Sequence, residues 1–101
     1  MTTSKPHKIV FFAKENCAPC LNTKVALDDV LKVHPEYSEI VTVLQKENHS
    51  ALVAAYELEL YPTVIIFDEE MNEITRRIGQ RHLTRDWWFA ALSSIHARRS
   101  A

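Results

Sequence analysis

A chain of 101 residues is long enough for one domain that buries a sizeable core without help from a metal ion or a disulfide. Apolar side chains make up 47% of it and charged side chains 25%, which is ordinary for a globular protein and excludes a disordered chain. No apolar run approaches a membrane span of eighteen residues or more. We therefore expect a single cytoplasmic domain over residues 1–101, with a polar N-terminal tail over residues 1–7.

The formal net charge of −1 is unevenly distributed along the chain. Residues 1–75 carry 6 basic and 12 acidic side chains, whereas residues 76–101 carry 6 and 1. This basic segment could guide an acidic protein partner or bind nucleic acid, but a solvated basic face is the simpler interpretation. Nucleic acid is not expected as a partner, because no interleaved aromatic residues accompany the arginines.

The first half of the chain predicts two strands and a helix. Residues 8–13 form an apolar run rich in Ile, Val and Phe, which is typical of a strand buried on both faces. Residues 14–16 form a loop, and residues 18–33 have helical periodicity with Pro19 in the first turn. The predicted apolar stripe of this helix comprises Leu21, Val25, Leu27, Val30 and Leu31. Pro35 ends the helix, and residues 40–44 predict a second buried strand.

The second half predicts a short helix, a hairpin and a final helix. Ser50 is suited to cap a helix that runs to about Tyr56. Residues 63–67 are β-branched and apolar, residues 68–72 form a polar turn, and residues 73–78 alternate weakly, which indicates an antiparallel pair closed by Gly79. Thr84 is suited to cap the last helix. The predicted stripe of that helix is Trp88, Ala91, Leu92 and Ile95.

The predicted order is thus β-α-β-α-β-β-α. A crossover helix joins the first two strands, which are then parallel, and a hairpin completes the sheet. We expect an α/β fold with a mixed four-stranded sheet and helices on both faces. The first strand would deliver the next residues to its C-terminal edge, where open α/β sheets meet their ligands.

At that edge stand the only two cysteines, in the segment Cys17-Ala18-Pro19-Cys20. Two thiols at this spacing can form a disulfide, and a helix N-terminus favours the thiolate of the first one. Cys17 is therefore the expected nucleophile and Cys20 the resolving partner. A zinc site would need two further ligands, and no third cysteine or suitably spaced histidine pair exists. Two inert cysteines remain a possible alternative.

Three segments together resemble the thioredoxin superfamily: Cys17-Ala18-Pro19-Cys20 after a strand, Tyr61-Pro62-Thr63 opening a later strand, and Ile78-Gly79 after the hairpin. The resemblance implies a thioredoxin-like fold in its minimal four-stranded form. It also implies a cis Tyr61–Pro62 bond beside the dithiol, with the Tyr61 backbone free to pair with an extended substrate. The implied substrate-binding residues are Ala18, Pro19, Tyr61, Pro62, Thr63 and Gly79. Gly79 would either provide an unusual φ angle at a turn or bulge, or leave space for substrate because it has no side chain.

Several positions depart from the family pattern. The buried carboxylate of thioredoxins falls on Phe11, its lysine neighbour falls on Val43, and Asn16 stands where thioredoxins carry tryptophan. Val25 lies near the position of the family's helix-kinking proline. No internal base is then evident for the proton of Cys20.

The expected function is a thiol–disulfide oxidoreductase that mainly reduces protein disulfides by dithiol exchange, with disulfide-containing client proteins as partners. We expect a monomer without a bound cofactor or metal, without a membrane partner, and re-reduced by a thioredoxin reductase or by glutathione. One alternative is a glutathione-dependent glutaredoxin. Another is a thioredoxin-fold adaptor that binds a larger protein through the dithiol face, with incidental redox activity.

Overall fold

The computed structural model describes residues 5–100, so most of the predicted N-terminal tail lies outside the described residues. The elements are β1 (Lys8–Ala13), α1 (Ala18–Val33), β2 (Val41–Gln45), α2 (Ser50–Ala55), β3 (Thr63–Phe67), β4 (Glu73–Ile78) and α3 (Arg85–Arg99). Three short 3-10 helices, η1 (Pro35–Glu39), η2 (Lys46–Asn48) and η3 (Gln80–His82), lie in the connections. The predicted order of strands and α-helices is confirmed, and the 3-10 helices are additions to it.

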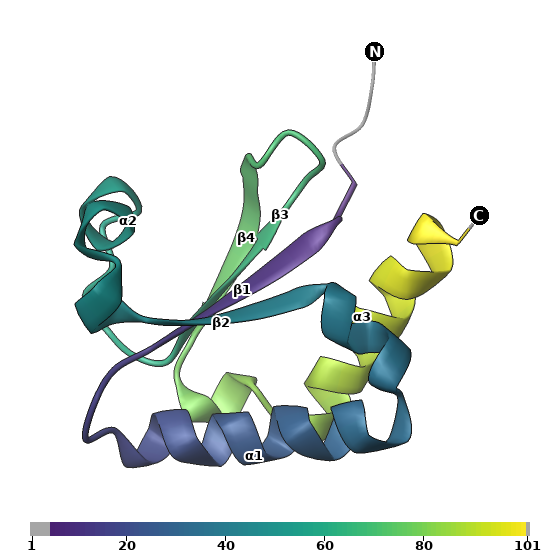
Figure 1. Cartoon of the computed structure of the whole chain (residues 1–101), viewed down its shortest axis with the longest axis horizontal. Helices are drawn as coiled ribbons and strands as arrows, with labels where there is room; N and C mark the ends of the chain where they lie inside the picture. Colours follow the sequence, from purple (N-terminus) through teal and green to yellow (C-terminus); the bar gives the residue numbers. More distant parts are fainter. Residues whose placement is uncertain (1–4, 101) are drawn as a thin grey trace.

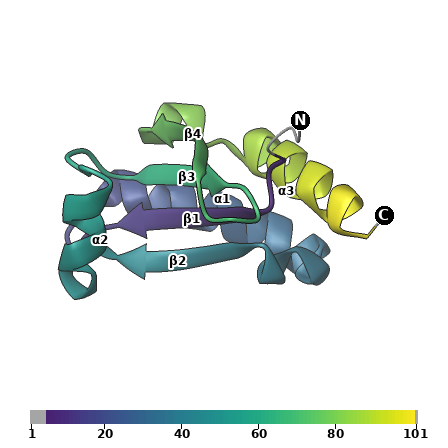
Figure 2. The same cartoon turned by 90° about the horizontal axis from the view of Figure 1, so that it is seen from above.

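The four strands form one mixed sheet in the order β2-β1-β3-β4 (Figure 1). β1 and β2 are parallel and joined through α1, whereas β3 is antiparallel to both β1 and β4. Helices α1 and α3 pack on one face of the sheet and α2 on the other (Figure 2). The predicted fold class is confirmed.

β1 lies inside the sheet because its side chains supply apolar groups to both faces. Ile9 and Phe11 belong to the core beneath α1 and α3, and Val10 and Phe12 to the core beneath α2. All four are at most 7% exposed. The strand therefore holds the chain rigidly up to Ala13, one short loop before the first cysteine.

The buried face of α1 differs from the predicted stripe. Its buried residues are Cys20, Thr23, Leu27 and Val30. Leu21 and Val25 are 67% and 59% exposed, so their prediction as core residues is wrong. A polar residue can occupy the buried stripe because the Thr23 hydroxyl donates a hydrogen bond to the Pro19 carbonyl at 2.8 Å.

β2 was predicted as a buried strand, and it is one of the two edge strands of the sheet. It begins one residue later than predicted, and Thr42, Val43 and Leu44 are only half-buried, since no strand lies beyond them. The predicted cap of α2 is also wrong: His49 is the N-cap residue and Ser50 is the first helical residue.

Side chains fix the turn between β3 and β4 and the start of α3. Asp68 accepts hydrogen bonds from the backbone amides of Glu70 and Asn72 at 2.9 and 2.8 Å, which closes the hairpin turn. The Thr84 hydroxyl accepts from the Trp87 amide at 3.1 Å, so Thr84 caps α3 as predicted. In the part of the chain that the structure describes, no helix is long and apolar enough to cross a membrane.

A candidate dithiol site

The two cysteines lie where β1 passes into α1. Cys17 is the N-cap residue of α1, Cys20 is in its first turn, and a disulfide joins them with their Cα atoms 5.2 Å apart. The residue before Cys17, Asn16, has a φ of +52°. Asparagine tolerates this left-handed conformation better than a bulky residue does. This turn gives a local reason for Asn16 at a position where thioredoxins carry tryptophan.

The first turn of α1 directs its backbone donors toward Cys17. The Cys20 amide donates a hydrogen bond to the Cys17 Sγ at 3.1 Å, and the Leu21 amide donates to the Cys17 carbonyl at 3.1 Å. An N–H group and the positive end of the helix dipole at one sulfur stabilise its thiolate relative to its thiol. The electrostatic difference between the two sulfurs thus favours Cys17 as the anion.

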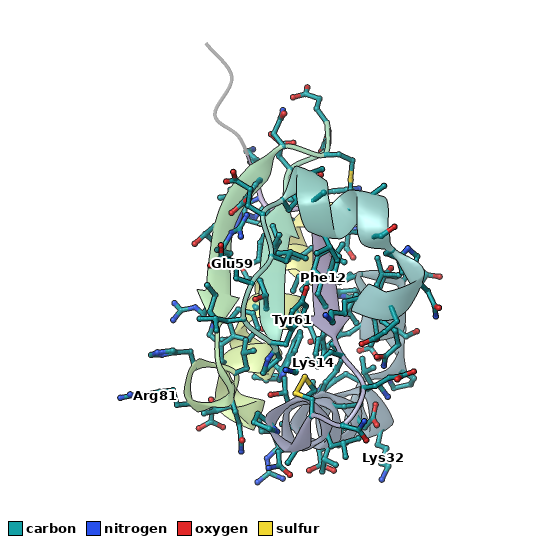
Figure 3. The ribbon with its side chains drawn as sticks, turned by 90° about the vertical axis from the view of Figure 1, so that its left-hand side faces the viewer. Phe12, Lys14, Lys32, Glu59, Tyr61 and Arg81 are labelled. Atoms are coloured by element: carbon teal, nitrogen blue, oxygen red, sulfur yellow. A yellow bond between two sulfur atoms is a disulfide. The ribbon has the colours of Figure 1, made fainter. Side chains whose placement is uncertain are left out.

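The two cysteines are almost equally buried, and they differ in whether they line a surface pocket. Cys17 and Cys20 are 6% and 4% exposed, and both belong to the core beneath α1. Only Cys17 lines a surface pocket of about 350 Å³, formed with Lys14, Glu15, Asn16, Leu21, Gln45, Glu47 and Asn48. Figure 3 shows the disulfide at this end of the molecule, with the labelled Lys14 and Tyr61 nearby. Ala18 and Pro19, the two residues between the cysteines, are exposed.

The segment Tyr61-Pro62-Thr63 begins at a residue that packs against the core cluster containing the dithiol. Tyr61 packs against the core cluster that contains both cysteines, and the Tyr61–Pro62 peptide bond is cis. The Thr63 hydroxyl donates to the Leu60 carbonyl, which fixes the start of β3. The structure therefore brings Tyr61, 41 residues beyond Cys20, to the core cluster that contains both cysteines.

Gly79 joins the same region through the backbone. Its amide donates to the Pro62 carbonyl at 2.9 Å, and its φ is +97°, a conformation that side chains other than glycine rarely adopt. A Cβ atom at Gly79 would meet nothing within 4 Å. The backbone conformation, rather than crowding, thus accounts for the glycine. A hydrogen bond of 3.4 Å from Asn22 to Gln80 ties the next residue to α1.

The core behind the cysteines is apolar where thioredoxins carry a carboxylate. Phe11 is fully buried, with its ring centroid 5.8 Å from that of Trp88. Val43 pairs with Phe11 across the parallel ladder. Among residues 5–100, no three His, Cys, Asp or Glu side chains form a group suited to hold a metal ion.

Glu47, which no sequence pattern singled out, lines the pocket with Cys17. Its carboxylate accepts a hydrogen bond from the Glu15 amide at 3.2 Å, and this bond ties η2 to the loop before Cys17. Burial, and secondarily the charge of Glu47, raise the pKa of the Tyr61 phenol. The Lys46 ammonium lies 5.6 Å from the centre of the Tyr61 ring. The sequence showed this stretch only as polar.

No family model and no curated protein matches the sequence. Solved structures do match. Thioredoxin 1 from the thermophilic eubacterium Thermosipho africanus is 21% identical with a TM-score of 0.65, covering 93% of this chain and 99% of its own. Chloroplastic thioredoxin z is 22% identical with a TM-score of 0.64, covering 88% and 77%.

Mitochondrial thioredoxin 3 from Saccharomyces cerevisiae, in its oxidized form, is 15% identical with a TM-score of 0.61, covering 85% of this chain and 76% of its own. At sequence identities of 15–22%, the similarity to these structures shows a shared backbone fold and nothing more. The sheet order, the helices on its two faces and the Cys17–Cys20 pair at the start of α1 agree with it. The chain therefore has the thioredoxin fold, as its resemblance to the thioredoxin superfamily implied.

Proposed function

We propose that the chain is a thiol–disulfide oxidoreductase that reduces disulfides of client proteins. The observation that carries this proposal is the asymmetry of the two sulfurs. Cys17 accepts an N–H bond at the helix N-terminus and lines the pocket of about 350 Å³, whereas Cys20 does not line this pocket. A dithiol exchange needs one activated, accessible thiolate and one partner held within reach of it.

The reaction begins with the reduced dithiol. The Cys17 thiolate attacks one sulfur of the client disulfide, the client S–S bond breaks, and the second client sulfur leaves as a thiolate that takes up a proton. Cys20 then loses its proton and attacks the Cys17 sulfur of the mixed disulfide. The Cys17–Cys20 disulfide forms, the first client sulfur leaves and is protonated, and the client has gained two electrons.

The disulfide that results must be reduced again by an outside thiol system. Either a thioredoxin reductase or glutathione could supply these electrons, and both belong to a reducing compartment such as the cytoplasm. The exposed surface beside Cys17, with Ala18, Pro19 and the Tyr61 backbone, is where an extended client segment would lie.

Insulin reduction tests the proposal. Purified protein is assayed in parallel with thioredoxin reductase plus NADPH and with glutathione, and turnover with at least one reductant is expected. Turnover with glutathione alone would identify the glutaredoxin alternative. No turnover with either, together with tight binding of a protein partner, would identify the adaptor alternative, which the apolar environment of Phe11 favours.

A further inference from the structure

A second pocket lies far from the dithiol, where the chain enters β1 and leaves α3. It has a volume of about 440 Å³ and is lined by Lys5, Pro6, His7, Glu69, Arg98 and Arg99. Cys17 begins α1 at the left of Figure 1, whereas the start of β1 and the end of α3 lie on the right. The dithiol chemistry therefore makes no use of this pocket.

The basic side chains of this pocket have no ion-pair partner among the described residues. Two other arginines of the described chain have carboxylate partners, Arg76 with Glu73 and Arg85 with Asp29. Within residues 5–100, Lys5, Arg98 and Arg99 form no ion pair. The pocket thus holds three permanent cations and the single carboxylate of Glu69.

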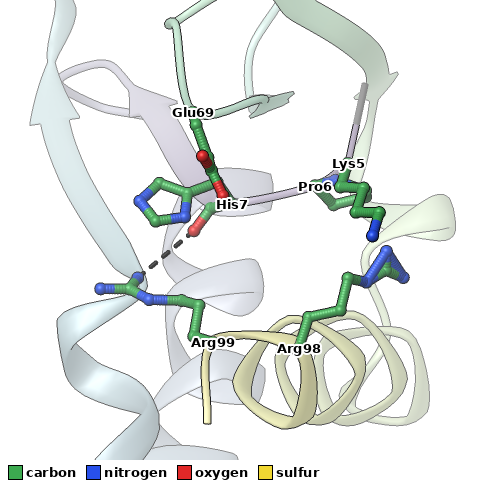
Figure 4. Close-up of a pocket in the computed structure, with 6 residues that line it drawn as sticks. All are labelled: Lys5, Pro6, His7, Glu69, Arg98 and Arg99. Carbon is green, nitrogen blue, oxygen red and sulfur yellow. Dashed lines mark hydrogen bonds between the residues drawn. The ribbon is translucent and has the colours of Figure 1, made fainter. Parts of the chain in front are cut away.

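The two guanidinium groups are held in place by neutral acceptors. Arg99 donates to the His7 carbonyl at 3.3 Å and Arg98 to the Ser94 hydroxyl at 3.0 Å. Figure 4 shows the first of these bonds, and it shows the Lys5 ammonium and the Arg98 guanidinium directed toward one another. Each arginine keeps further N–H donors for a ligand.

The end of α3 explains only part of this arrangement. Its last carbonyl groups carry about half a negative charge, which favours Arg98 and Arg99 at this position. That half charge does not balance three cations, and Lys5 comes from a different segment. An anion between them would remove the repulsion and occupy the free donors.

We propose that this pocket binds a small compound that carries two or more phosphate groups. Guanidinium groups pair with the oxygens of phosphate through two parallel N–H bonds, and a lysine adds a mobile point charge. The volume is within the range of small-ligand sites and exceeds the need of a single small anion. The three basic side chains outnumber the one lining carboxylate by two, which favours a ligand with more than one negative charge.

Calorimetric titration of the full-length oxidised protein with inorganic pyrophosphate tests this site without any thiol chemistry. We expect saturable binding to one site at near-physiological salt, and weaker binding of inorganic phosphate. The double variant Lys5→Gln/Arg98→Gln should lose affinity by about tenfold or more, since two charged hydrogen-bonding groups are removed. Arg99 is kept because it also fixes the backbone of His7.

Lys32→Gln is the matched control, because Lys32 is an exposed lysine near the end of α1 without an ion pair in the described chain. It should change the affinity by less than about twofold. An absence of saturable pyrophosphate binding would overturn the proposal. Equal losses in the control and the double variant would do the same, as would binding of a phosphoserine peptide without binding of pyrophosphate.

Discussion

At the scale of single residues, the two sulfurs of the dithiol have different tasks because they have different surroundings. Cys17 accepts the N–H of residue 20 and lines a pocket, and Cys20 does neither. A Cys20→Ser variant should therefore accumulate mixed disulfides with client proteins, and Cys17→Ser should accumulate none. Non-reducing electrophoresis after incubation with a disulfide-containing client measures both. Equal trapping by the two variants would contradict the assignment of the nucleophile.

The apolar side chain of Phe11, in the same core cluster as Cys20, leads to a second prediction about a single residue. Cys20 must lose a proton during resolution, and among the described residues it belongs to an apolar core cluster. Phe11→Asp should therefore resolve a preformed mixed disulfide faster at neutral pH than Phe11→Asn, which has the same shape and no basic oxygen. Both variants should lose about 3–5 kcal/mol of unfolding free energy from the missing ring. Equal resolution rates in two folded variants, measured by rapid quench, would show that an internal base is not needed.

The Tyr61 hydroxyl is buried and has no hydrogen-bond partner among the described residues. Tyr61→Phe removes an unsatisfied polar group, so at neutral pH it should be neutral or stabilising by up to about 1 kcal/mol. The pKa of the phenol is raised by burial and then by Glu47. Its contribution to stability is therefore complete below its ordinary pKa of about 10 and is lost as the pH rises through the folded value.

Urea unfolding at pH 9 and at pH 11 checks this sign. Between these two pH values the unfolding free energy of the wild-type protein should fall more than that of the Tyr61→Phe variant. The reason is that only the wild-type protein has a phenol at position 61 whose ionisation is hindered by burial in the folded state. The ionisation of lysines affects both proteins alike. Identical losses in the two proteins would mean that the Tyr61 phenol does not experience the buried environment.

At the scale of elements, α2 and α3 offer a direct comparison of two hydroxyl residues near helix starts. Thr84 accepts the Trp87 amide, whereas Ser50 makes no capping bond because His49 is the N-cap residue of α2. Thr84→Ala should cost about 1 kcal/mol of unfolding free energy. Ser50→Ala should change it by less than about 0.5 kcal/mol. A larger cost at Ser50 than at Thr84 in chemical denaturation would contradict these cap positions.

The same elements show what could be predicted from the sequence. Strands β1, β3 and β4 were predicted to the residue because apolar or alternating runs end at clear loop signals. The buried face of α1 was not predicted correctly. Leu21 and Val25 also recur at helical spacing although they are exposed, and the polar Thr23 is buried because its hydroxyl bonds to the Pro19 carbonyl. The short 3-10 helices have too few residues to show a period.

Some features of the candidate site could also be predicted from the sequence, and others could not. The C-x-x-C spacing and the strand before it are local signals, and they predicted the position of the disulfide. Glu47 could not be found in this way. Its link to the dithiol loop joins residues 32 positions apart, and no local pattern marks such a contact.

At the scale of the whole molecule, the disulfide should contribute much less to the free energy of unfolding than the hydrophobic core does. The cluster beneath α1 and α3 includes large buried side chains such as Trp88, Leu92 and Ile95, and the second cluster fills the opposite face of the sheet. Closing a loop as short as residues 17–20 removes little entropy from the unfolded chain, about 2 kcal/mol in the loop-closure model. The core, rather than the disulfide, should therefore decide whether the chain folds.

The last prediction follows from this balance. The fully reduced protein should stay folded, with an unfolding free energy at most about 2 kcal/mol below that of the oxidised protein. The double variant Cys17→Ser/Cys20→Ser, which cannot form the bond, should match the reduced protein. Urea unfolding followed by Trp fluorescence, with and without a strong phosphine reductant, measures all three states. A redox centre must survive both of its states, so unfolding on reduction would make the bond a structural staple and would remove the basis of the proposed function.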